Sequence, residues 1–178
     1  MTDRLTKKGL ILAIEFLIMA ARVVAIVWRL FFYHSASQPL SSGSPVPVSV
    51  AQAVNFPVYY PDPQRLPAAY TLDNSSFRQA QPGVVIYSIK SPGSQSLTVS
   101  EEEQPAGSVI TDFIKNYIPL HDSVSTSFGE AQVGAYGKAP NLQTVASLPI
   151  KNGPWLIITA PSDIKQTDLT QILQSLRR

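Results

Sequence analysis

The chain has 178 residues with 44% hydrophobic composition, a formal net charge of +2 and no cysteine. This length allows one soluble domain beside a long apolar stretch, and the lack of cysteine excludes disulfides, thiolate metal sites and lipid attachment through cysteine. The first 34 residues carry five basic and two acidic residues against nine and ten in the remainder, so the positive charge does not indicate a nucleic-acid-binding surface.

Residues 9–33 form an apolar stretch that is long enough for a membrane helix. At about 1.5 Å rise per residue, it can cross a hydrocarbon core of about 30 Å. Three basic residues lie within residues 1–8, and no Lys or Arg follows the stretch until Arg65. The positive-inside bias therefore predicts a single-pass membrane protein with a cytoplasmic tail at residues 1–8 and an extracytoplasmic C-terminal part.

Glu15, Arg22 and Arg29 are spaced by seven residues, so they share one face of this predicted helix. Arg29 is close enough to the outer end to reach the interface. Glu15 and Arg22 lie deeper, where a charge is costly unless protein surrounds it. Either both pair with another transmembrane helix, from a second copy or a different subunit, or a lone anchor tolerates them through snorkelling, bilayer thinning and a protonated Glu15.

Two other interpretations of the N-terminus remain open. The stretch can be a cleaved signal peptide with its cleavage site at residues 35–37, although it is longer than the usual core of about 7–15 residues. Residues 7–15, KKGLILAIE, also resemble the start of a type IV prepilin, which is cut after a glycine. In that family a glutamate is fifth after the cut, whereas Glu15 is sixth after Gly9. This resemblance implies an alternative function, a pilin-like structural subunit of a surface filament or secretion assembly.

Residues 34–55 are rich in serine and proline and show no clear periodicity. Such a composition is typical of an extended, semi-flexible linker. We expect it to hold the following domain away from the bilayer.

Residues 56–178 are predicted to form the extracytoplasmic domain. A run rich in β-branched and aromatic residues predicts a strand at 83–90, and alternation of Leu97 and Val99 with Thr98 predicts another at 95–100. A turn at Pro92-Gly93 joins them. Ser108 can cap a helix that ends before Pro119.

Strand patterns then return at residues 123–128, 131–136, 143–148 and 154–159. Asn152-Gly153 predicts the last hairpin turn, and Thr167 can cap a final helix with leucines at helical spacing. Separated helices within a run of hairpins predict an α+β fold, with one antiparallel sheet and two helices packed on one face.

This domain is similar to a bacterial extracytoplasmic domain of unknown function, related to lipoprotein-sorting and sigma-regulator sensor folds and often found behind a transmembrane helix. The matching positions, besides the predicted central hairpin, are residues 57–61, 66–70, 153–155 and 169–176. The resemblance implies a curved sheet that presents a hydrophobic or peptide-binding face, and no catalysis.

Catalytic motifs are hard to find. The histidines are His34, at the predicted membrane edge, and His121, which adjoins Asp122. Adjacent residues seldom face each other as a triad requires. No nucleophile elbow, P-loop or dinucleotide glycine pattern occurs. Consecutive glutamates at 101–103 alternate between faces of a strand, so we interpret them as a solvated sheet edge and not as a metal site. The sequon at residues 74–76 matters only in a eukaryotic secretory pathway. We predict no catalytic residue, metal or cofactor.

Four aromatic residues are candidates for binding, namely Tyr59, Tyr60, Tyr70 and Trp155, although a strand tryptophan such as Trp155 more often belongs to a core. The predicted function is that of a membrane-anchored protein whose extracytoplasmic domain binds or scaffolds a cell-envelope partner. The predicted partners are the membrane, another transmembrane helix, and an envelope protein or hydrophobic ligand, without nucleic acid.

Overall fold

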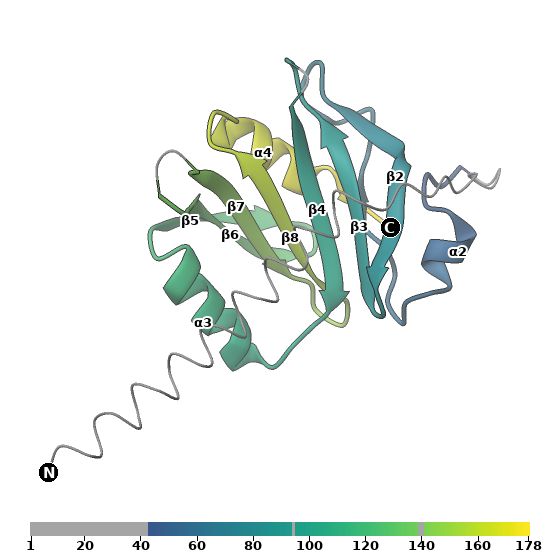
Figure 1. Cartoon of the computed structure of the whole chain (residues 1–178), viewed down its shortest axis with the longest axis horizontal. Helices are drawn as coiled ribbons and strands as arrows, with labels where there is room; N and C mark the ends of the chain where they lie inside the picture. The colour runs from purple at the N-terminus through teal and green to yellow at the C-terminus, as the bar shows by residue number, and fades with distance from the viewer. Residues whose placement is uncertain (1–42, 94, 139–140) are drawn as a thin grey trace, which may run out of the picture. The chain divides into compact units, whose positions relative to one another are not determined.

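The computed structural model describes residues 43–178 except Ser94, Ala139 and Pro140. A seven-stranded antiparallel sheet dominates these residues, in the order β2-β3-β4-β8-β7-β6-β5 (Figure 1). Its strands are β2 (Thr71–Gln81), β3 (Val84–Lys90), β4 (Ser96–Glu103), β5 (His121–Thr126), β6 (Gly129–Tyr136), β7 (Gln143–Pro149) and β8 (Pro154–Pro161). A two-stranded sheet pairs β1 (Tyr60–Pro61) with β9 (Leu176–Arg177). The helices are α2 (Val48–Ala51), α3 (Gly107–Tyr117) and α4 (Gln166–Gln174).

Strand alternation divides the sheet into two faces. On one face, residues such as Val99 of β4 and Ile158 of β8 join a core cluster that includes Leu169, Ile172 and Leu173 of α4. Trp155 points to the other face, where its ring meets Phe113 of α3 edge to face with 5.0 Å between centroids. The two longer helices therefore pack on opposite faces, and α4 lies behind β8 and β4 in Figure 1.

The predicted fold class is wrong. The described residues are mostly β, with nine strands in two sheets and three short helices, and α3 and α4 do not share a face. Strand β2, TLDNSSFRQAQ, mixes polar residues on both faces, so its pattern did not indicate a strand. Within the described part of the chain, no helix is long and apolar enough to cross a membrane. The predicted membrane helix at 9–33, with Glu15 and Arg22, lies outside the described residues.

Several predicted elements agree with the structure. β3 and β4 form the expected hairpin, with Lys90 opposite Ser96, and α3 ends before Pro119 as expected. The N-caps differ, because Ala106 and Lys165 precede α3 and α4 without a side-chain capping bond. Residues 43–55, which the sequence assigns to the linker, contribute Val46 and Val50 to the core cluster.

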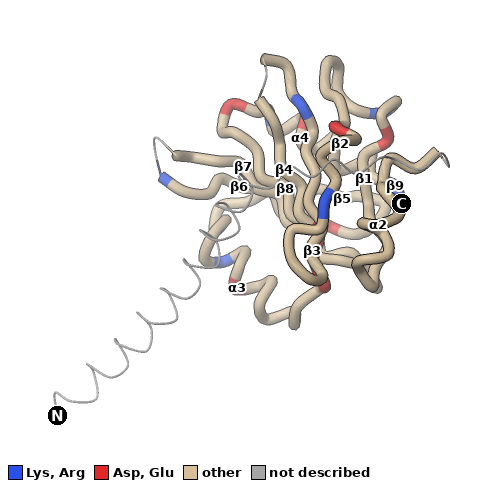
Figure 2. Tube along the Cα trace, turned by 45° about the vertical axis from the view of Figure 1, so that its right-hand side comes forward, with Lys and Arg blue, Asp and Glu red and all other residues tan. Residues whose placement is uncertain are grey.

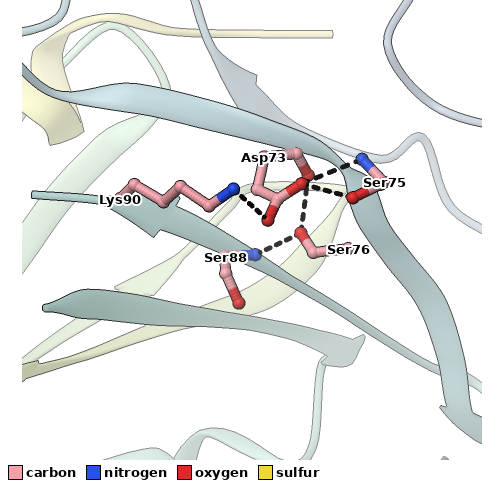
Figure 3. A network of polar contacts seen from close by, with 5 residues as sticks. All are labelled: Asp73, Ser75, Ser76, Ser88 and Lys90. Atoms are coloured by element: carbon pink, nitrogen blue, oxygen red, sulfur yellow. Dashed lines mark hydrogen bonds and ion pairs between the residues drawn. The ribbon is translucent and has the colours of Figure 1, made fainter. Parts of the chain in front are cut away.

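One edge of the large sheet is irregular. The register of β2 shifts between Asp73 and Arg78, and a polar network holds the resulting bulge (Figure 3). One carboxylate oxygen of Asp73 accepts the Ser75 hydroxyl at 2.6 Å, and the other lies 2.9 Å from Lys90 Nζ. The Ser76 hydroxyl donates to the Asp73 carbonyl at 2.6 Å and accepts the Ser88 N–H at 2.8 Å. Such a bulge makes β2 a poor template for a further strand.

Candidate functional site: a groove at the β5 edge

Strand β5 forms the other edge of the sheet, and its backbone is regular. Within the described residues it pairs with β6 alone, in a register without shifts from His121 opposite Gly134 to Thr126 opposite Gly129. A groove of about 520 Å³ runs between β5 and α4. We call it the β5–α4 groove, and its lining residues are Asp122, Ser123, Val124, Ser125, Gln166, Thr167, Thr170 and Gln174.

A side-chain contact shows which backbone groups of β5 face outward. The Gln174 side-chain amide donates to the Ser125 carbonyl oxygen at 3.3 Å, so this carbonyl points away from β6. In an antiparallel strand, alternate residues direct both backbone groups to the same side. The backbone N–H and C=O groups of Ser123 and Ser125 therefore point away from β6, toward the free edge of the sheet. A further strand needs this pattern to pair with β5.

The helix lies beside this edge because of its sequence period. Its apolar residues Leu169, Ile172 and Leu173 are buried against the sheet. Gln166, Thr170 and Gln174 are spaced by four residues, so they form a neighbouring stripe. The stripe faces β5, since the Gln166 amide donates to an Asp122 carboxylate oxygen at 2.7 Å and Gln174 reaches Ser125.

His121 and Asp122 point to opposite faces of β5 and do not act together. Asp122 is directed toward α4, whereas His121 Nδ1 lies 2.9 Å from the Ile118 carbonyl oxygen at the end of α3. Among the described residues lining the groove, Asp122 alone is charged. Over the described domain, Lys and Arg are scattered among Asp and Glu without a region of one sign (Figure 2). The groove therefore offers backbone and amide hydrogen bonds and one carboxylate, an arrangement suited to holding a peptide.

The four aromatic residues predicted for binding are buried, with 4–7% of each exposed. Tyr59 packs edge to face on Phe128 with 4.8 Å between centroids, and Tyr60 lies under the Arg177 guanidinium. The Tyr70 hydroxyl donates to Asp168 at 3.1 Å, and burial first, then this hydrogen bond, raises its pKa to about 12.

Trp155 is separate from the tyrosines, because it lies on the opposite sheet face. Its indole N–H donates to the Ser147 hydroxyl at 2.8 Å. The structure thus brings the tyrosines into the core and leaves no shared aromatic platform among these four residues. The groove residues on α4 were missed, although the spacing of Gln166, Thr170 and Gln174 was visible in the sequence.

The glutamates at 101–103 do not form a solvated edge, because β4 lies inside the sheet between β3 and β8. Glu101 is fully buried, and both of its carboxylate oxygens accept the Tyr59 N–H. Burial raises the pKa of the Glu101 carboxyl well above its usual range, against the lowering effect of this hydrogen bond. Burial also raises the pKa of Glu102. No group of three or more potential metal-ligating side chains occurs within the described residues.

No protein-family model matches the chain, and no significant match was found among curated proteins or solved structures. The resemblance of residues 56–178 to a bacterial extracytoplasmic domain therefore stays a prediction. The pilin-like alternative depends on residues 7–15, which lie outside the described residues.

Proposed function

We propose that this chain is a membrane-anchored, non-catalytic binding protein, and that its extracytoplasmic domain captures an extended segment of a cell-envelope protein at β5. The observation that carries the proposal is the outward carbonyl of Ser125, held by the Gln174 amide at 3.3 Å in a groove beside α4. Domains that bind peptides by strand addition use an exposed sheet edge in this way, with main-chain bonds for affinity and side-chain pockets for specificity.

The incoming segment takes the place of the Gln174 side chain at the Ser125 carbonyl. A neutral hydrogen bond of this kind contributes about 1 kcal/mol, so its displacement is cheap compared with a row of new backbone bonds. Every second side chain of the segment then faces the stripe of Gln166, Thr170 and Gln174. A lysine or arginine of the segment lies opposite Asp122, because a carboxylate favours a cationic neighbour. This pairing fixes the direction in which the segment runs along β5.

The membrane anchor of the proposal is supported by the apolar stretch at residues 9–33 and the basic residues before it. Such an anchor keeps the binding domain in the compartment where segments of other envelope proteins are available.

Strand addition is tested by a proline placed where it blocks an incoming strand and spares β6. Ser125→Pro removes an outward N–H, whereas the β5–β6 bonds use Asp122, Val124 and Thr126. Ser125→Ala is the matched control, because it keeps the backbone N–H. A photo-crosslinking residue at Thr170, in the full chain in its native membrane, reports contacts in the groove.

We expect a crosslink to one extended segment of an envelope protein, mapped by mass spectrometry. It should fall at least tenfold in Ser125→Pro and persist in Ser125→Ala. A synthetic peptide of that segment should bind the purified full chain with the same ranking of variants. Crosslinking that Ser125→Pro leaves unchanged would contradict capture at β5.

A further inference from the structure

Leu120 is the most exposed large hydrophobic residue of the described chain, with 86% of its surface open to solvent. It lies between the end of α3 at Tyr117 and the start of β5 at His121. Single exposed apolar residues are common on protein surfaces. Leu120 differs because of how firmly its backbone is held and because of what lies next to it.

The turn that carries Leu120 is tightly packed. Ile118, just before it, is fully buried, and His121 Nδ1 lies 2.9 Å from the Ile118 carbonyl oxygen. Strand β6 approaches so closely that a Cβ built on Gly134 would lie 2.5 Å from the Leu120 carbonyl oxygen. A side chain on such a backbone is presented in a defined place, which lowers the entropic cost of using it as an anchor.

The two residues that flank Leu120 in the chain, Pro119 and His121, line a hollow of about 310 Å³. Its lining is mainly apolar and consists of Thr111, Ile114, Lys115, Pro119 and His121. The volume is roughly ten times that of a water molecule in the liquid, so it accepts a side chain of the size of leucine. We call it the α3 hollow. An exposed leucine therefore lies between two residues that line a hollow large enough for a leucine side chain.

This surface also carries one charge of each sign. Asp112 and Lys115 are three residues apart on α3 and therefore neighbours on the helix, and both are exposed. Neither forms an ion pair with a described residue. When two α3 helices meet antiparallel about a twofold axis that passes between these two residues, Lys115 of one copy comes opposite Asp112 of the other.

The exposed side of α3, the α3 hollow and Leu120 together form what we call the α3 surface. We propose that it is a twofold-symmetric interface with a second copy of this chain, in which Leu120 of each copy fills the α3 hollow of the other. A twofold interface uses the same patch on both subunits, so the patch must be complementary to itself. The leucine beside the hollow and the paired opposite charges meet that requirement. A second copy is therefore the occupant that this surface fits.

The contact involves only one helix and one turn of each copy. It therefore buries less surface than the roughly 1,200–2,000 Å² that stable interfaces usually bury. Self-association should therefore be weak in dilute solution and stronger when both copies share one membrane, because anchoring raises their effective concentration. This last step rests on the membrane anchor of the proposed function, whereas the complementarity of the surface does not. α4 lies on the opposite sheet face, so the interface leaves the β5–α4 groove open.

Site-directed crosslinking can test the interface without background, because the chain contains no cysteine. The full chain in detergent at high protein concentration is prepared as Leu120→Cys, Thr111→Cys and Val109→Cys. Leu120→Cys is mixed with either of the other two and oxidised mildly. Thr111 lines the hollow, whereas Val109 is also exposed but lies about 140° around the helix from Ile114.

We expect disulfide-linked dimers at least fivefold more abundant in the mixture with Thr111→Cys than in the mixture with Val109→Cys. Added to that pair, Asp112→Lys or Lys115→Asp alone should reduce dimers, and the double swap should restore them. Equal crosslinking in both mixtures, or a double swap no better than the single changes, would overturn the interface. Ser125→Pro should leave the dimer yield unchanged, so failure of peptide capture and failure of this interface remain distinguishable.

Discussion

Both carboxylate oxygens of Glu101 accept the backbone N–H of Tyr59, at 3.1 and 3.0 Å, inside the protein. The Tyr87 hydroxyl donates to the carbonyl of the same Tyr59 at 2.8 Å. Two side chains of the sheet therefore satisfy both backbone groups of one residue in the segment that leads into β1. This arrangement fixes the segment to the core face, and its titratable group makes the attachment dependent on pH.

Burial raises the folded-state pKa of Glu101 well above its unfolded value, so the folded protein binds this proton more tightly. Stability contributed by the neutral carboxyl is present at low pH and is lost as pH rises through the folded pKa. We expect Glu101→Gln, which stays neutral and keeps an acceptor for Tyr59, to raise the melting temperature at pH 8 by several degrees. The gain should shrink toward pH 4.5, and the exposed Glu103→Gln should show none. A loss of stability in Glu101→Gln of equal size at every pH would contradict this account.

Tyr87→Phe should destabilise the domain at neutral pH. The substitution leaves the buried Tyr59 carbonyl without its 2.8 Å partner, which costs about 1–3 kcal/mol. Urea unfolding monitored by fluorescence measures the difference in free energy of unfolding. Tyr136→Phe is a suitable control, because the Tyr136 side chain is partly exposed. An unchanged midpoint in Tyr87→Phe would show that this hydroxyl is dispensable.

Gly134→Ala should be destabilising by about 1–3 kcal/mol, because its Cβ would lie 2.5 Å from the Leu120 carbonyl oxygen and 3.2 Å from Ile118. Gly107→Ala, at the start of α3, meets no atom within 4 Å and should be neutral or slightly stabilising. Thermal unfolding of the two variants gives a direct comparison. Equal effects would mean that the close approach of β6 to the Leu120 turn is not important for stability.

Gln174→Ala should tighten peptide capture, because the incoming segment no longer displaces an amide from the Ser125 carbonyl. The hydrogen bond contributes about 1 kcal/mol, which corresponds to an increase in affinity of up to about fivefold. Gln171→Ala is the control on the same helix, since the Gln171 amide donates to the Arg65 carbonyl, outside the groove. Titration with the crosslinked peptide measures both, and weaker binding by Gln174→Ala would show that the contacts of this side chain with the peptide outweigh the hydrogen bond that the peptide displaces.

The sequence predicted the elements with a strong apolar signal. β3 and β8 are runs rich in apolar residues, β4 alternates between apolar and polar positions, and α3 shows a clear apolar face. β2 was not predicted, because an edge strand with polar residues on both faces shows no two-residue period of apolar side chains. The side on which α3 packs depends on the connection from β4 to the far edge of the sheet, which local patterns do not encode.

The misreading of Glu101 has the same origin. Three consecutive glutamates resemble a solvated edge, and only the position of β8 beside β4 places the first of them in the core. The candidate groove was missed for a related reason. The polar spacing in α4 was visible, but nothing local indicates that Gln174 lies next to Ser125, 49 residues earlier in the chain.

The placement of β8 has a consequence for the way the protein is made. β2, β3 and β4 follow one another along the chain, as do β5, β6 and β7, and the two groups meet only through β8. During synthesis, the free side of β4 has no neighbour until residues 154–161 emerge, near the end of the chain. Pairing over such a distance is slow, and an unpaired apolar strand aggregates readily. A nascent chain truncated before Pro154 should therefore depend on chaperones to stay soluble.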